Sequence, residues 1–214
     1  MDHTATATFP GAAPAPLHVH PGAAPGHGEE PATGIPNDKM GMWVFLCSEV
    51  MFFTGLIGSY IVLRFGTPNW PHPGDTLNIW LTAANTFLLI CSSVTMVQAL
   101  AAIQRGDSRK MKLFLSLTLL FGSCFLSVQA FEYWKLLHHG FNPKVSLFGS
   151  VFYTTTGFHG FHVFCGVVCI SFVTGKAFLG KYTKEHHQGI ETIGLYWHFV
   201  DLVWIVLFTI IYLF

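Results

Sequence analysis

Five long apolar segments constrain this chain more than any other feature of its sequence. They lie near residues 41–63, 79–102, 113–135, 149–177 and 191–214. Each is long enough to cross the hydrocarbon core of a bilayer, which takes about 20 residues of helix. Only helices and closed barrels satisfy their backbone hydrogen bonds in lipid, and these segments lack the alternating pattern of strands. We therefore predict an all-α membrane protein, a bundle of five transmembrane helices.

The segment before the first apolar run has a different character. Ala, Pro, Gly and His dominate residues 1–38, with no apolar stretch long enough to insert and no signal-peptide pattern. We predict a disordered cytoplasmic tail over 1–38 and a membrane domain over 39–214. The tail histidines could bind a transition metal, although scattered histidines in such an arm are more often simply solvated. They are His3, His18, His20 and His27.

The distribution of charge predicts the orientation of the chain in the membrane. With a net charge of zero, the chain has no basic field for nucleic acid. If the N-terminus is cytoplasmic, eight Lys and Arg residues fall on the inner side and three on the outer side. The positive-inside rule then favours an inner N-terminus and an outer C-terminus. Aromatic residues near the span ends, such as Trp80, Trp134 and Tyr212, fit interfacial belts.

Glu49 lies near the middle of the first apolar segment, where an ionisable side chain is costly and marks function by default. No Lys or Arg in that segment can pair with it. We expect the carboxyl group to be neutral, or hydrogen-bonded across a helix contact. Two roles stay open: a protonated glutamate that ties two helices together, or a group that handles protons.

Further polar residues lie within the third, fourth and fifth segments. His159 and His162 are three residues apart, as are His198 and Asp201, so the members of each pair lie on one helical face. Gln129 and Glu132 lie toward the outer end of the third segment. Such a set could build a metal or haem site, or it could be a hydrogen-bonded packing network. No Glu-x-x-His pair recurs on two helices, as a di-iron bundle requires.

Several strings of residues carry a resemblance to a known family. SEVMFFTG (48–55), QAFEY (129–133), TGFHGFHV (156–163), HHQGIE (186–191) and YWHFVDLVW (196–204) have the order and spacing found in cytochrome c oxidase subunit III. The resemblance runs from about Asp38 to the C-terminus. Each string alone is a weak signal, but all of them occur in register.

This resemblance implies a non-catalytic subunit of an aa3- or caa3-type cytochrome c oxidase in aerobic electron transport. Haem a and copper are then expected in partner subunits, with no metal and no catalytic residue in this chain. The expected partners are subunit I as the main contact, subunit II, a small subunit IV, and cytochrome c as electron donor. The expected location is the bacterial inner membrane.

The resemblance also assigns roles to individual residues. Glu49 matches an intramembrane glutamate that reacts with hydrophobic carbodiimides. The family binds phospholipid and uses it to sustain proton uptake by the catalytic subunit, and Lys176 and Lys181 match the basic positions for lipid headgroups. The remaining polar residues become packing or water-organising groups. They are Gln129, Glu132, His159, His162, Glu191, His198 and Asp201.

One departure from the family pattern limits what can be carried over. The long mitochondrial-type subunit has seven helices with the motif glutamate on the third, whereas Glu49 lies on the first predicted helix. The lipid contacts of the two leading helices therefore cannot be transferred. Short five-helix forms occur in bacterial oxidases, where helices of another subunit can take that place.

Two other functions stay open. One is the equivalent subunit of a quinol oxidase or of a nitric-oxide-reductase-associated complex. The other is a free-standing proton-coupled transporter, with Glu49, His162 and Asp201 as a relay. The sequence shows no inverted repeat and no matching pair of broken helices, which argues against a transporter.

Overall fold

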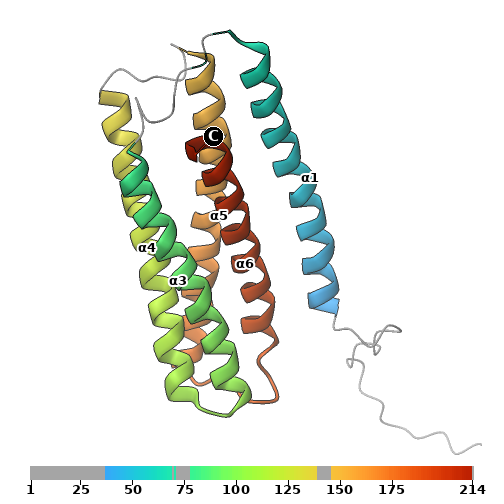
Figure 1. The fold of residues 1–214 in the computed structure, drawn as a ribbon. Helices are drawn as coiled ribbons and strands as arrows, with labels where there is room; N and C mark the ends of the chain where they lie inside the picture. The colour runs from blue at the N-terminus through green and yellow to red at the C-terminus, as the bar shows by residue number, and fades with distance from the viewer. Residues whose placement is uncertain (1–36, 69, 71–77, 139–145, 214) are drawn as a thin grey trace, which may run out of the picture. The chain divides into compact units, whose positions relative to one another are not determined.

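The computed structural model describes residues 37–68, 70, 78–138 and 146–213. The predicted tail and its four histidines lie outside these residues, apart from Asn37 and Asp38, which begin the first helix. The described residues form five long α-helices and one π-helical turn (Figure 1). The elements are α1 (Asn37–Gly66), α3 (Ile79–Gln104), α4 (Ser108–His138), α5 (Leu147–Phe178), α6 (Gln188–Phe208) and η1 (Thr209–Leu213).

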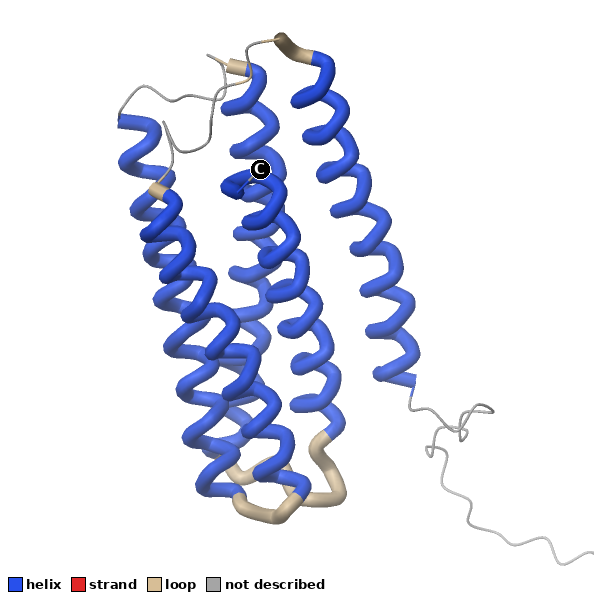
Figure 2. The backbone as a smooth tube through the Cα atoms, viewed as in Figure 1, coloured by secondary structure: helices blue, strands red, loops and turns tan. Residues whose placement is uncertain are grey.

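The prediction of five membrane-spanning helices is confirmed. α1, α3, α4, α5 and the continuous α6–η1 unit are each long and apolar enough to cross a membrane. Helix and loop account for the whole described part of the chain (Figure 2). The helices run a few residues beyond the predicted segments at most ends, because polar residues can extend a helix into the interfacial region.

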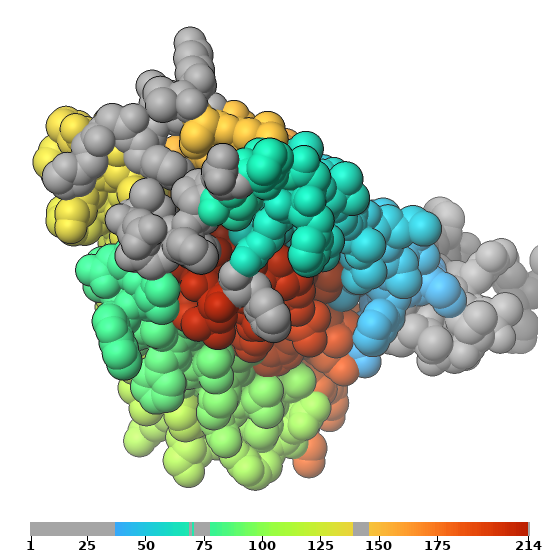
Figure 3. Space-filling view, turned by 45° about the horizontal axis from the view of Figure 1, so that its top comes forward, coloured from blue at the N-terminus to red at the C-terminus, as the bar shows by residue number. Residues whose placement is uncertain are grey.

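Four of the helices form a ring and the fifth packs against its outside. α3 contacts α4, α4 contacts α5, α5 contacts α6, and α6 closes the ring on α3. α1 packs against α6 and α5. In the space-filling view of Figure 3, atoms of α6 lie between those of α1 and those of α3. α1 is therefore attached to the ring along one side only.

Local sequence signals explain where two helices begin and where the chain turns between α3 and α4. Asn78 and Ser146 cap α3 and α5, accepting hydrogen bonds from the backbone N–H groups of Leu81 (3.3 Å) and Gly149 (3.0 Å). Gly106 turns the chain between α3 and α4 with a φ of 84°, a region that favours glycine. Asp107 then accepts a hydrogen bond from the Lys110 backbone N–H (3.1 Å), which lowers the pKa of this carboxyl group.

Trp197 of α6 fills a slot at the centre of the ring. Its side chain is 1% exposed. A Cβ atom added at Gly122 of α4 would lie 2.7 Å from the Trp197 indole, and one added at Gly166 of α5 would lie 2.8 Å from it. Both glycines are therefore needed for the indole to fit between α4 and α5. The Trp197 indole N–H donates to Ser92 of α3 (3.0 Å).

Small polar residues follow the buried face of α3. Thr82, Asn85, Thr86 and Ser92 are all buried there. Trp204 of α6 donates its indole N–H to Thr86 (2.9 Å), so α6 is linked to α3 at two levels by tryptophan. Hydrogen bonds between helices satisfy polar groups that lipid cannot.

The aromatic belt expected at the span ends is only partly present. Trp80 and Trp134 are exposed, at 87% and 57%. The prediction was wrong for Tyr212, which is 3% exposed. The reason is that η1 places the ring inside the bundle, where it packs against Phe152 of α5 and Trp204 of α6.

Candidate functional site

Glu49 of α1 and His162 of α5 form a polar contact between two apolar helices. The Glu49 Oε2 and His162 Nε2 atoms are 3.0 Å apart, and the two side chains are 17% and 14% exposed. For Glu49 the sequence left open a neutral carboxyl group or a hydrogen bond across a helix contact, and this contact joins two helices. Its partner is an imidazole from another segment, which no inspection of the first segment could identify.

The second nitrogen of His162 determines how many protons this pair holds. Nδ1 lies 2.7 Å from the carbonyl oxygen of Phe158. A carbonyl oxygen only accepts hydrogen bonds, so Nδ1 carries a proton. One more proton must then lie between Nε2 and the Glu49 carboxyl group. The pair is either glutamic acid with neutral imidazole or carboxylate with imidazolium, and both forms have no net charge.

Aromatic rings and a tyrosine hold the pair in place. The His162 ring packs edge-on against Phe53 of α1, with ring centroids 5.1 Å apart. Tyr196 of α6 donates its hydroxyl to the backbone oxygen of His162 (2.9 Å). The pair therefore lies where α1, α5 and α6 meet, and it connects α1 to the ring.

His159 occupies a different environment from His162, although the two are one helical turn apart. Its side chain is 1% exposed and stacks on Trp204, with centroids 4.8 Å apart. Neither ring nitrogen has a hydrogen-bond partner among the described residues. Phe53 is near both histidines, with its centroid 6.4 Å from that of His159. His159 thus faces the interior of the ring, and His162 faces α1.

Two further polar contacts link α3 to its neighbours. His198 Nδ1 of α6 lies 2.6 Å from the Ser93 hydroxyl, and Asp201 interacts with the same serine. Near the start of α3, Thr82 donates its hydroxyl to Glu132 Oε1 of α4 (3.0 Å). The two α3 partners, Ser93 and Thr82, were missed by sequence reasoning, because hydroxyl residues are common in helices and carry no spacing signal of their own.

Glu191 lies apart from the intramembrane residues. It lies in the first turn of α6 and pairs with Lys39 at the start of α1, with Oε1 and Nζ 2.5 Å apart and both side chains 27% exposed. This ion pair joins α1 to the ring at the end of the bundle where the α3–α4 and α5–α6 connections also lie (Figure 1).

The residues predicted to bind lipid headgroups lie at this same end. Lys176 is in the last turn of α5 and Lys181 follows that helix. Both side chains are exposed, and neither makes an ion pair with a described residue. The backbone holds the two positions together, because Lys181 N–H donates to the carbonyl oxygen of Lys176 (3.1 Å). Both charges are free to meet an anionic group.

Within the described part of the chain, no three His, Cys, Asp or Glu side chains gather closely enough to hold a metal ion. The absence of a metal site in the whole chain stays a prediction.

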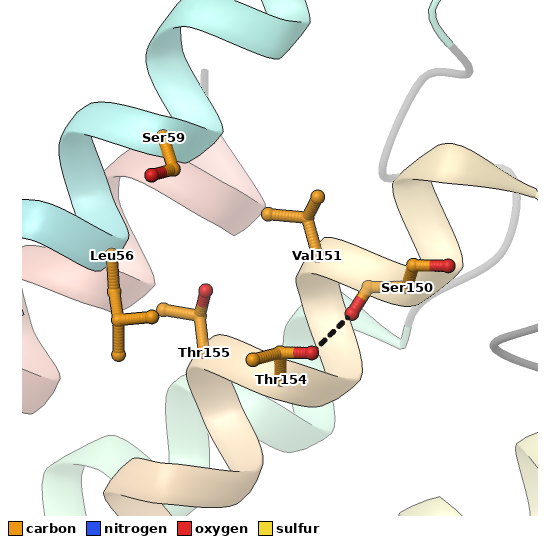
Figure 4. A pocket seen from close by; sticks show the side chains of 6 residues that line it. All are labelled: Leu56, Ser59, Ser150, Val151, Thr154 and Thr155. Atoms are coloured by element: carbon orange, nitrogen blue, oxygen red, sulfur yellow. Dashed lines mark hydrogen bonds between the residues drawn. The ribbon is translucent and has the colours of Figure 1, made fainter.

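A cleft of about 170 Å³ lies between α1 and α5, toward the ends of these helices that are remote from the Lys39–Glu191 ion pair (Figure 4). Its lining residues are Leu56, Ser59, Ser150, Val151, Thr154 and Thr155. Ser59 and Thr154 donate their hydroxyls to backbone oxygens of their own helices (both 2.8 Å). The cleft is thus largely apolar despite its hydroxyl-bearing residues.

Several known proteins are similar to this chain. The family model described as "Cytochrome c oxidase subunit III" matches residues 26–214. A probable cytochrome c oxidase subunit 3 of Mycobacterium tuberculosis (strain ATCC 25618 / H37Rv) is 40% identical over 175 residues, which cover 81% of this chain and 86% of that protein. The cytochrome c oxidase subunit 3 of Thermostichus vulcanus is 37% identical over 175 residues with the same coverage.

A third relative extends the match further along this chain. The cytochrome c oxidase subunit 3 of Synechocystis sp. (strain ATCC 27184 / PCC 6803 / Kazusa) is 39% identical over 196 residues, covering 90% of this chain and 81% of that protein. The five spans and these matches lead to one conclusion: the chain belongs to the cytochrome c oxidase subunit III family.

Proposed function

We propose that this chain is a non-catalytic subunit of an aa3- or caa3-type cytochrome c oxidase, which binds phospholipid and supports proton uptake by the catalytic subunit. Subunit I is its main partner, with subunit II and a small subunit IV in the same complex, and cytochrome c donates the electrons. Haem a and copper belong to the partner subunits. The complex lies in the bacterial inner membrane, with the N-terminus of this chain cytoplasmic.

Family membership over residues 26–214 is the observation that carries this proposal. Within the chain, the exposed Lys176 and Lys181 support the binding of anionic headgroups, since a cation near a lipid surface contributes about 1 kcal/mol. The apolar cleft between α1 and α5 supports the binding of an acyl chain. The Glu49–His162 pair supports a part in proton handling, because it holds one proton that can lie on either group.

The main competing function is the equivalent subunit of a quinol oxidase or of a nitric-oxide-reductase-associated complex. The relatives named above as cytochrome c oxidase subunits favour the first proposal. The purified complex separates the two, since a cytochrome c oxidase oxidises reduced cytochrome c and a quinol oxidase does not. A free-standing transporter would purify without haem a.

The supporting role is tested by following oxygen consumption over many turnovers. An oxidase stripped of this chain should begin with nearly full activity and then inactivate faster than the intact complex, because slow proton uptake leaves reactive intermediates at the catalytic centre. A Lys176→Ala/Lys181→Ala complex should show part of that loss with the chain still bound.

A matched control removes two other exposed cations at the same end of the bundle. Arg105→Ala/Arg109→Ala alters the α3–α4 connection and should inactivate like the wild type if the lipid contact is specific to Lys176 and Lys181. Equal inactivation rates in the intact, stripped and Lys-variant complexes would refute the supporting role. A stripped complex with no initial activity would show that the chain takes part in catalysis.

A further inference from the structure

One face of α4 carries three polar side chains into the interior of the ring. Gln129, Glu132 and Tyr133 are spaced i, i+3 and i+4, so they lie together on the helix surface. Gln129 is 4% exposed and Glu132 is 8% exposed. These side chains lie toward the end of α4 that is remote from the Lys39–Glu191 ion pair.

Residues from the neighbouring helices surround this face with oxygen and nitrogen atoms. Thr82 of α3 donates to Glu132, and Tyr133 donates its hydroxyl to Thr156 of α5 (2.5 Å). Asn85 of α3 donates its amide to the carbonyl oxygen of Phe125 (3.3 Å), one turn before Gln129. Three helices thus contribute polar groups to one region of the core.

The π-helical turn adds a fourth contribution. η1 directs Tyr212 inward, where its hydroxyl lies within interaction range of Thr82 and Gln129. π-Helical turns are rare and occur often at functional sites. Here the turn brings a further hydroxyl group to the polar face of α4.

Several atoms in this region have unmet hydrogen-bonding capacity. The Tyr133 and Tyr212 hydroxyls lie close to the Gln129 amide, but neither its nitrogen nor its oxygen makes a hydrogen bond of good geometry with a described residue. The Asn85 Oδ1 atom has no partner among the described residues either. A primary amide offers two donors and an oxygen that accepts twice. Buried polar groups without a protein partner are typically bridged by ordered water, which makes two to four hydrogen bonds.

We propose that the core of the ring is a binding site for water, held between the Gln129 amide, the Asn85 oxygen and the Tyr212 hydroxyl. Water bound there links α4 to α3 and to η1, and it extends the hydrogen bonds of Glu132 and Tyr133 through the core. Gln129 is the central residue, since it has the largest number of free donors and acceptors. The inference does not depend on the proposed function of the complex.

X-ray radiolysis of the intact oxidase complex in H₂¹⁸O tests this site, because hydroxyl radicals formed from bound water modify adjacent side chains even when they are buried. Tyr212 should be modified several-fold faster than Trp197, which is also buried but is enclosed by Gly122 and Gly166. Tyr182, a partly exposed residue after α5, reports the radical dose in every sample. Modification of Tyr212 at or below the rate of Trp197 would overturn the proposal.

A Gln129→Met variant separates water held at this site from general access of solvent. Methionine keeps nearly the same length without the amide, so modification of Tyr212 should fall to the rate of Trp197 while that of Tyr182 is unchanged. Ser127→Ala is the control on the same helix, because Ser127 is exposed and donates only to the backbone oxygen of Ser123. Unchanged modification of Tyr212 in Gln129→Met would show that Gln129 does not hold the water.

Discussion

At the scale of single residues, the Glu49–His162 pair shows how a carboxyl group is accommodated at bilayer depth. The pair holds one shared proton and no net charge, which avoids the large cost of an isolated ion in lipid. A glutamate alone in the first span would have to be neutral for this reason. The structure allows a second solution, since the imidazole of another helix can share the proton.

Two substitutions of Glu49 should distinguish its role as a hydrogen-bond partner from its role as a group that carries a proton. Glu49→Gln keeps a donor for His162 Nε2, so the chain should assemble normally. Glu49→Leu leaves that nitrogen without a partner and should lower stability by about 1–3 kcal/mol. Thermal unfolding of the purified complex measures both effects, and equal losses in the two variants would contradict the hydrogen-bonding role.

Infrared difference spectra of wild type and Glu49→Gln then show where the proton lies. We expect the substitution to remove a protonated carboxyl band, because glutamic acid beside a neutral imidazole places no separated charges in an apolar setting. Loss of a carboxylate band instead would place the proton on His162. A hydrophobic carbodiimide should react with the wild type and not with Glu49→Gln.

At the scale of the helices, close packing around Trp197 fixes how α4, α5 and α6 fit together. Gly122 and Gly166 contact the Trp197 indole, and a side chain at either position would collide with it. Other glycines of α5 meet open space, so their role cannot be the same: Gly157, Gly160 and Gly175. The difference between these glycines depends on a tryptophan from another helix, so it is invisible in the sequence of α5.

Alanine substitutions should reveal this difference directly. Gly166→Ala places a methyl group 2.8 Å from Trp197 and should destabilise the chain by about 1–3 kcal/mol through overpacking. Gly160→Ala on the same helix meets nothing within 4 Å and should be neutral or slightly stabilising, since alanine favours helix. The melting temperatures of the two variants test this expectation, and equal values would argue against the slot.

At the scale of the whole molecule, α1 and the ring of α3 to α6 bring several charged residues together at one end of the bundle. The Lys39–Glu191 pair, the α3–α4 turn and the exposed Lys176 and Lys181 share one end of the bundle. The positive-inside rule predicts that this end is cytoplasmic. The orientation can be measured without purifying the complex.

Engineered cysteines provide that measurement in intact cells. Ser108→Cys in the α3–α4 turn should be shielded from a membrane-impermeant thiol reagent, and Pro68→Cys after α1 should be labelled. A background without the five native cysteines removes their contribution. Labelling of Ser108→Cys with protection of Pro68→Cys would reverse the proposed orientation.

The sequence by itself determined the number of spans and their limits to within a few residues, because apolar length and loop composition depend only on neighbouring residues. It also marked the costly polar residues, such as Glu49 and His159, and the motif strings that indicated the family. The tertiary structure alone decided their partners: Glu49 with His162, Glu132 with Thr82, and Tyr212 buried rather than interfacial. These pairings depend on which helix faces meet, and lipid is so similar to an apolar core that hydrophobic periodicity cannot tell a buried face from an exposed one.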